Sequence, residues 1–262
     1  MKRFPLWGLV ALAVLIVVDR LRAPDSSIVS RQASATVEPR VHARTAATPA
    51  VPAPSPGPSA DASDSSRTPM IDLLARAEAR RRILAASALT FFDSLFAETD
   101  SVLRRWSDNS FVIGVAPTGS SVDPALLEMV RGAVAAWERV APDIRFRIAT
   151  DTIGTQIVAR AADQLDGERV GLTDLEWTRS GAIHHALITL ARRDRRGLPI
   201  PRAVALSVAI HEVGHALGLP HSPNPGDVMF PTTRAAQPSF RDTATLRLLY
   251  QLPAGSIREP TR

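Results

Sequence analysis

An H-E-x-x-H-x-x-G-x-x-H pattern restricts this chain more than any other feature of its sequence. On a helix, His211 and His215 lie one turn apart on the same face, so both imidazoles can bind one metal ion. Glu212 is adjacent to the first histidine and can hold and deprotonate a water molecule at the metal. Gly218 stands where a helix favours a left-handed residue at its end, and the returning chain supplies His221 as a third ligand. Three protein ligands with an open fourth position indicate a catalytic zinc site rather than a structural one.

The same pattern resembles the signature of the metzincin zinc peptidases, in which a methionine-containing turn follows the third histidine. Met229 comes eight residues after His221, within Asp-Val-Met-Phe-Pro, and Ser222 follows the third histidine directly. Both features are most similar to the matrixin branch. The resemblance implies an α+β, zincin-like fold over residues 99–257. Such a fold has a twisted five-stranded mixed sheet and three helices, and its active-site helix is followed by the Met-turn and a C-terminal helix.

The chain of 262 residues contains no Cys, which excludes disulfides, thiolate metal sites and thiol nucleophiles. It also excludes the propeptide Cys that blocks the zinc in many matrixins. Lys2 is the only Lys, and the heavy use of Arg, Ala and Pro suggests a bacterial genome of high GC content. The net charge of +5 is densest at residues 192–196, which we expect to form a solvated loop, and we expect no nucleic-acid partner.

Residues 1–23 have the organisation of an export signal. Lys2 and Arg3 precede an apolar run of thirteen residues, 6–18, which suits a signal-peptide core and is short for a membrane span. No good cleavage site follows, so a single-pass N-terminal membrane anchor is the alternative to a signal peptide. In either case we expect an exported protein that is secreted, periplasmic or membrane-anchored, with its catalytic domain outside the cytoplasm. Residues 24–69 are rich in Pro, Ala, Ser and Thr, which predicts a disordered linker.

Residues 70–98 are predicted to be an amphipathic helical segment. Leu84, Ala88, Phe91, Phe92 and Leu95 recur at spacings of three and four residues, which indicates one helix running to about residue 97. This segment is either a stalk helix that packs on the outer surface of the catalytic domain or a pro-segment that docks on it. At the other end, residues 258–262 are predicted to be a short tail.

Apolar runs and turn signals predict the elements of the catalytic domain. The predicted strands are 111–116, 144–149, 154–160, 170–175 and 182–190. Helices are predicted after an N-cap at Asp123, over 201–217, and after an N-cap at Ser239. Asp166 and Gly167 suit a tight hairpin between two of the strands.

Two further features of the sequence have residue types that can bind metal. The acidic residues of the turn at 163–168 are a weak candidate for Ca²⁺, because the ligand spacing of a calcium loop is missing. His184 and His185 are adjacent in a predicted strand and therefore point to opposite faces of the sheet. Matrixins have a second, structural zinc held by His and Asp residues of this region, but the partner His residues are absent here. That site is therefore not expected, and one catalytic zinc remains.

The resemblance also implies where a substrate binds. An extended peptide would pair with the edge strand at Gly171, Leu172 and Thr173, through backbone hydrogen bonds. Pro231, Thr232 and Thr233 would line the pocket beside the zinc, and Met229 would form a hydrophobic floor under the metal.

The sequence thus predicts a monomeric zinc metalloendopeptidase (EC 3.4.24 type) that hydrolyses internal peptide bonds of proteins or peptides, with Glu212 as general base. One alternative is an exported zinc-binding protein with little or no proteolytic turnover. Another is a zinc hydrolase with a substrate other than a peptide. The presence of Glu212 favours an enzyme over a binding protein.

Overall fold

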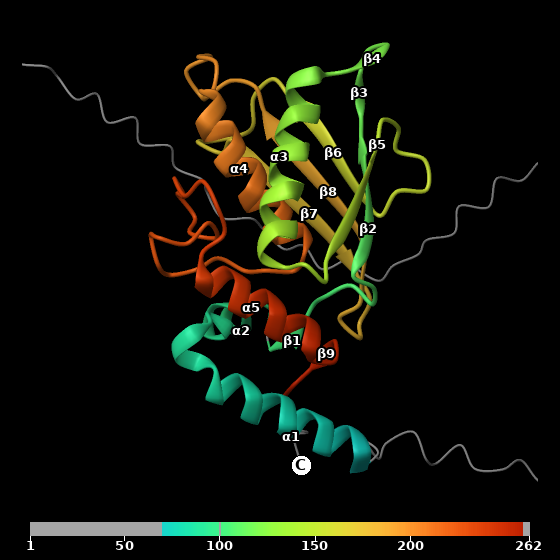
Figure 1. The fold of residues 1–262 in the computed structure, drawn as a ribbon, viewed down its shortest axis with the longest axis vertical. Coiled ribbons are helices and arrows are strands. Elements are labelled where there is room, and N and C mark those ends of the chain that lie inside the picture. The colour runs from blue at the N-terminus through green and yellow to red at the C-terminus, as the bar shows by residue number, and fades with distance from the viewer. Residues whose placement is uncertain (1–69, 100, 259–262) are drawn as a thin grey trace, which may run out of the picture.

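A mixed sheet with helices on one face forms the centre of the molecule (Figure 1). The computed structural model describes residues 70–99 and 101–258; the predicted export segment 1–23, the predicted linker 24–69 and residues 259–262 of the predicted tail lie outside this range. The helices are α1 (Met70–Ala85), α2 (Phe92–Thr99), α3 (Pro124–Val140), α4 (Arg202–Ala216) and α5 (Phe240–Gln251), with a 3-10 turn, η1 (Ser87–Leu89). The strands are β1 (Val102–Leu103), β2 (Ser110–Val115), β3 (Pro117–Thr118), β4 (Ser121–Val122), β5 (Arg145–Ala149), β6 (Ile157–Ala162), β7 (Gly171–Trp177), β8 (Ile183–Ala191) and β9 (Gly255–Ser256).

The main sheet has five strands in the order β5-β2-β6-β8-β7. The first four are parallel, and β7 runs antiparallel to β8 at the edge. The inner strand β2 buries Phe111, Ile113 and Val115, as expected of a strand covered by helices. Helices α3 and α4 contact each other and pack on this sheet (Figure 1). The predicted α+β class and the five-stranded mixed sheet are confirmed.

The predicted hairpin at Asp166 and Gly167 is wrong. Gly167 does adopt a left-handed turn conformation, with φ of +72°. However, β8 lies between β6 and β7 in the sheet, so the two strands that flank this turn are not paired. An Asp-Gly pair favours a turn in the local backbone, but it does not determine which strands pair. Strand β8, which comes later in the chain, lies between β6 and β7.

Helix starts follow the predicted caps. The Asp123 side chain accepts a hydrogen bond of 2.9 Å from the backbone N–H of Ala125, and Pro124 occupies the first turn. Ser239 and Asp242 form a reciprocal capping box at α5, with Asp in the place of the usual Glu.

The N-terminal segment is broken rather than one continuous helix. Helix α1 ends at Ala85, Thr90 is extended, and α2 begins at Phe92. The break allows Phe91, Phe92 and Leu95 to reach the core of the catalytic domain, where each is at most 2% exposed. The free energy gained by burying these side chains favours the break over the single continuous helix that the residue spacing predicted.

Helices α1 and α2 lie beside α5 at the lower end of the molecule in Figure 1. Arg80 donates a hydrogen bond of 2.8 Å to the carbonyl of Ile257, and the short strands β1 and β9 pair antiparallel. The two ends of the described chain are therefore joined. Within residues 70–99 and 101–258, no helix has the length and apolar character needed to cross a membrane.

Candidate metal centre

Helix α4 places the first two histidines inside the protein. Its C-terminal half is buried, and His211 and His215 are 0% and 7% exposed. After the helix, Gly218 adopts φ of +97°, and a Cβ there would lie 2.5 Å from the carbonyl oxygen of Arg104. Glycine is therefore required both for the turn and for the close approach. The turn then brings His221 back to the other two rings.

The three predicted ligands form one cluster. One ligand atom from each of His211, His215 and His221 lies within 4.8 Å of the others, and among the residues that the structure describes this is the one group of three or more metal-ligating side chains found. The Nε2 atoms of His211 and His215 are 3.0 Å apart. Two nitrogens bound to one tetrahedral zinc at about 2.0–2.1 Å are separated by a little over 3 Å. The spacing fits a zinc ion.

The protonation of the imidazoles also fits a metal. Nδ1 of His211 lies 2.7 Å from the carbonyl oxygen of Val228, and Nδ1 of His215 lies 2.8 Å from that of Leu219. A carbonyl oxygen only accepts, so each Nδ1 carries the hydrogen and each Nε2 keeps its lone pair. The two facing Nε2 atoms then have no hydrogen between them, whereas a cation between them would accept both lone pairs.

Burial keeps these rings neutral. Burial, opposed by the hydrogen bond to Val228 and reinforced by the nearby His221, lowers the pKa of His211 to about 3. Burial also lowers the pKa of His215 well below its ordinary value. Neutral imidazoles are the form that binds metal, so both ligands need no deprotonation at neutral pH.

Glu212 lies between α4 and the edge strand β7. Its side chain is 2% exposed, and its Oε2 accepts a hydrogen bond of 2.7 Å from the hydroxyl of Thr173. A Cβ on Gly171 would lie 2.3 Å from Oε1 of Glu212, so only glycine leaves room for the carboxylate. Two of the three edge-strand residues predicted to pair with substrate, Gly171 and Thr173, thus also enclose the predicted base. Leu172, the third, is half-buried between them.

Met229 lies under the histidine-bearing helix. It is fully buried, and a Cβ on Gly214 would approach its Sδ to 2.3 Å. Because Gly214 is between the two helical histidines in sequence, the sulfur packs directly against that turn of α4. The Asp242 carboxylate accepts the backbone N–H groups of Val228 at 2.8 Å and Met229 at 3.3 Å, which ties the turn to the start of α5.

The predicted pocket wall is only partly accessible. Pro231 and Thr232 are half-buried, whereas Thr233 is 5% exposed and its hydroxyl donates to the carbonyl of Asp227 at 3.2 Å. The side chain of Thr233 therefore supports the loop, and Pro231 and Thr232 remain the partly accessible candidates. A hollow of about 20 Å³ beside His215 and His221, room for about one water, is lined by neither.

Several side chains near the centre gave no signal in the sequence. Glu98 on α2 lies 3.4 Å from Nδ1 of His221. The guanidinium of Arg104 stacks over Trp177 at 3.9 Å and lines the same small hollow. These residues are brought to the centre by tertiary packing, so no local pattern marks them.

The other two metal candidates have different partners. The Arg run expected to be a solvated loop pairs with acidic residues of the 163–168 turn: Arg193 lies 3.6 Å from Asp163, and Arg195 lies 2.8 Å from Glu168. These carboxylates are engaged by cations, which disfavours calcium. His184 is exposed and faces Glu176 at 3.8 Å, away from the three-histidine cluster.

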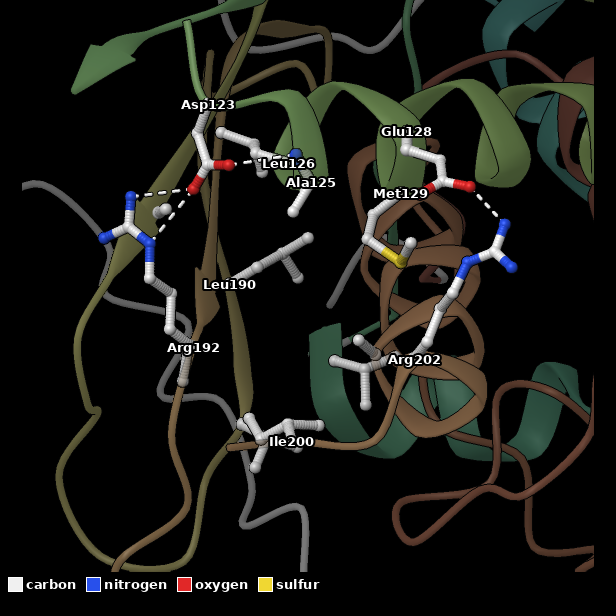
Figure 2. Close-up of a pocket in the computed structure, with 14 residues that line it drawn as sticks. Asp123, Ala125, Leu126, Glu128, Met129, Leu190, Arg192, Ile200 and Arg202 are labelled. Atoms are coloured by element: carbon white, nitrogen blue, oxygen red, sulfur yellow. Dashed lines mark hydrogen bonds and ion pairs between the residues drawn. The ribbon is translucent and has the colours of Figure 1, made fainter. Parts of the chain in front are cut away.

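A larger cavity of about 320 Å³ lies near the N-terminal end of α4 (Figure 2). Its wall is mostly apolar, and ion pairs between Asp123 and Arg192 and between Glu128 and Arg202 stand at its rim. None of the three histidines lines it. The chemistry of the cluster is therefore separate from this cavity.

Comparison with known proteins agrees with the geometry. The matrixin family model (Peptidase_M10) matches residues 105–251, more than half of the chain. A macrophage metalloelastase of Rattus norvegicus is 47% identical over 51 residues, which are 18% of this chain and 11% of that protein. A matrilysin of Felis catus is 46% identical over 66 residues, 25% of this chain and 21% of that protein. The chain thus spans only a small part of the length of these relatives. The match to the family model, however, covers all three histidines and the five-stranded sheet. The chain therefore belongs to the matrixin family.

Proposed function

We propose that this protein is a zinc-dependent endopeptidase that hydrolyses internal bonds of proteins or peptides. The observation that carries the proposal is the cluster of three histidines beside the buried carboxylate of Glu212. Two of the rings present unprotonated Nε2 atoms 3.0 Å apart. His211, His215 and His221 would hold one zinc ion, and membership of the matrixin family supports this assignment.

The residues of the chain then have distinct roles. Zinc, when bound, would polarise the scissile carbonyl and lower the pKa of a water molecule. Glu212 would take a proton from that water at a carboxylate oxygen and pass it to the leaving amine. Thr173 would keep the carboxylate in place through its 2.7 Å hydrogen bond to Oε2. Met229, packed against α4, would support the helix that carries two of the ligands.

Substrate binding is proposed at the edge of the sheet. Strand β7 is the last strand in the order, so its outer edge can pair with an extended peptide. Gly171, Leu172 and Thr173 would offer backbone groups to that peptide, and Pro231 and Thr232 would flank the scissile bond. Such pairing recognises the backbone of the substrate more than its side chains.

The setting of the enzyme is proposed from the sequence outside the described residues. An apolar run at 6–18 after Lys2 and Arg3 supports export through a signal peptide or a membrane anchor. Residues 24–69 would then be a spacer between the export segment and a monomeric catalytic unit on the outside of the cytoplasm.

The test is a digest with matched variants. The purified chain is expected to contain about one zinc per molecule and to cleave casein or a peptide library. Glu212→Ala is expected to keep the zinc and to lose activity by about 100- to 10,000-fold, because general acid–base catalysis contributes a factor of that size.

Glu78→Ala serves as the control, since Glu78 is an exposed residue of α1 paired with Arg81. It should cleave as the wild type does. A wild-type protein that bound one zinc and cleaved no peptide would favour the zinc-binding or non-peptide alternatives, and a protein without zinc would overturn the site.

A further inference from the structure

Glu98, on helix α2, contacts the third histidine from outside the family-matched region. The match covers residues 105–251, whereas Glu98 precedes it. One carboxylate oxygen, Oε1, lies 3.4 Å from Nδ1 of His221 and 3.3 Å from the backbone nitrogen of the same residue. A single oxygen therefore faces both hydrogen-bond donors on one side of this histidine.

The three histidines differ in what holds their rings. Nδ1 of His211 and of His215 each faces a backbone carbonyl oxygen, at 2.7 and 2.8 Å. At His221 the corresponding partner is the side chain of Glu98. A partner on the far ring nitrogen fixes the tautomer and the orientation of a metal-binding imidazole. This support matters most for His221, because it follows the end of α4 and no helix fixes its backbone.

Glu98 lies behind the histidine rather than among the ligands. The described residues whose ligand atoms lie within 4.8 Å of one another are the three histidines, without Glu98. A carboxylate facing Nδ1 leaves Nε2 of His221 directed to the other two rings. The geometry is therefore that of a support for a ligand.

The position of Glu98 is fixed by the packing of its helix. Phe92 and Leu95 of α2 are buried in the common core, and the backbone N–H of Phe91 donates to the hydroxyl of Thr245 on α5 at 3.2 Å. Just after α2, the N–H of Ile257 donates to the carbonyl of Ser101 at 3.1 Å. Helix α2 is thus attached at both ends to the C-terminal part of the fold.

We propose that Glu98 is a positioning residue that orients the imidazole of His221 for zinc, and that α2 is a permanent part of the metal centre rather than a removable pro-segment. This inference rests on the proposed function for the identity of the metal. The inference extends the functional domain beyond the family-matched region to include helix α2, which precedes that region.

The test measures zinc affinity in the full chain, by competition with a fluorescent chelator. Loss of an outer partner of a metal ligand typically weakens the metal by about 10- to 100-fold, so Glu98→Ala is expected to weaken zinc by that factor. Glu98→Gln keeps a carbonyl oxygen that can accept from Nδ1, and it should recover a large part of the loss. A role limited to helix stability would not give this difference between the two variants.

Glu176→Ala is the matched control, because Glu176 faces His184 at 3.8 Å and neither residue belongs to the cluster. It should bind zinc as the wild type does. Circular dichroism of each variant verifies that the fold is retained, and if Glu98→Ala does not fold, Glu98→Leu, which has a larger side chain without an acceptor, takes its place. Zinc affinity within twofold of the wild type in the folded variant without an acceptor, Glu98→Ala or Glu98→Leu, would overturn the inference.

Two further outcomes separate this inference from the proposed function. Wild-type protein that binds zinc but cleaves nothing would overturn the peptidase and leave the Glu98 comparison valid. An active, processed enzyme whose chain begins after Glu98, as read by mass spectrometry of its N-terminus, would overturn the roles of Glu98 and α2 and leave the peptidase proposal standing.

Discussion

At the scale of single residues, the hydroxyl of Thr173 has a sharper role than its place in an edge strand suggested. It is fully buried and donates to Oε2 of Glu212 at 2.7 Å. A hydrogen bond to a charged group contributes about 1.5–3 kcal/mol, equivalent to roughly a tenfold to hundredfold effect. We therefore expect Thr173→Val, which keeps the shape and removes the hydroxyl, to lower kcat by about that factor with little change in KM.

Thr173→Ser restores the donor and is the control, so steady-state kinetics should show most of the lost kcat returning. Because the backbone at this position is unchanged in both variants, pairing with a peptide should be conserved. Equal kcat values for Thr173→Val and the wild type would show that the hydroxyl does not position the base.

The residues of the metal centre that could be predicted from their spacing lie within a few positions of one another in the sequence. His211, Glu212 and His215 are fixed by helical periodicity, which is visible in any window of the chain. Thr173 and Glu212 are 39 positions apart, and Glu98 and His221 are 123 positions apart. Contacts of this kind depend on strand order and helix packing, and neither is encoded in a local pattern.

At the scale of elements, prediction succeeded where the local signal and tertiary packing agree. The starts of α3 and α5 follow from their cap residues, and the five strands of the main sheet follow from apolar runs. It failed for the two-residue strands β1, β3, β4 and β9, which are too short to show a period of two. Prediction from sequence also failed for the hairpin between β6 and β7, which do not pair, and for the break between α1 and α2. Both features are determined by distant parts of the chain.

The cap of α3 gives a test at this scale. Burial raises the pKa of the Asp123 carboxyl, but hydrogen bonds from Arg192 and from the Ala125 N–H outweigh it and hold the pKa below its ordinary value of 3.8. The charged form is thus favoured by the fold. Its contribution is present above pH 3.8 and is lost as the pH falls through the lower, folded-state pKa.

Asp123→Ala is therefore expected to lower the free energy of unfolding by about 1 kcal/mol at pH 7, the usual effect of removing an N-cap. The difference from the wild type should shrink as the pH falls below 3.8. Urea unfolding of the metal-free proteins measures both effects. Asp143→Ala, at an exposed loop position, is the control and should differ little from the wild type at either pH. A difference that did not depend on pH would contradict a charged cap.

At the scale of the whole molecule, the metal centre joins parts of the chain that are otherwise far apart. Its ligands come from α4 and the loop after it, the Met-turn beneath it is held by α5, and Glu98 reaches it from α2. Strand β1, which follows α2, also pairs with β9 near the end of the described chain. A ligand bound at such a junction stabilises the complete fold, because unfolding any of these parts disrupts the site.

Zinc should therefore raise the stability of the entire protein by mass action. At a free zinc concentration of 100 times Kd, the expected gain is about 2.7 kcal/mol. For a chain of this size each kcal/mol shifts Tm by about 2–4 °C, so a strong chelator should lower Tm by roughly 5–10 °C in a single transition. Glu212→Ala keeps all three ligands and should show the same shift, whereas His221→Ala should show a much smaller one. If the chelator lowered Tm equally in the wild type and in His221→Ala, the stabilising metal would lie outside the histidine cluster. If the chelator did not change the Tm of the wild type, the fold would form this junction without zinc.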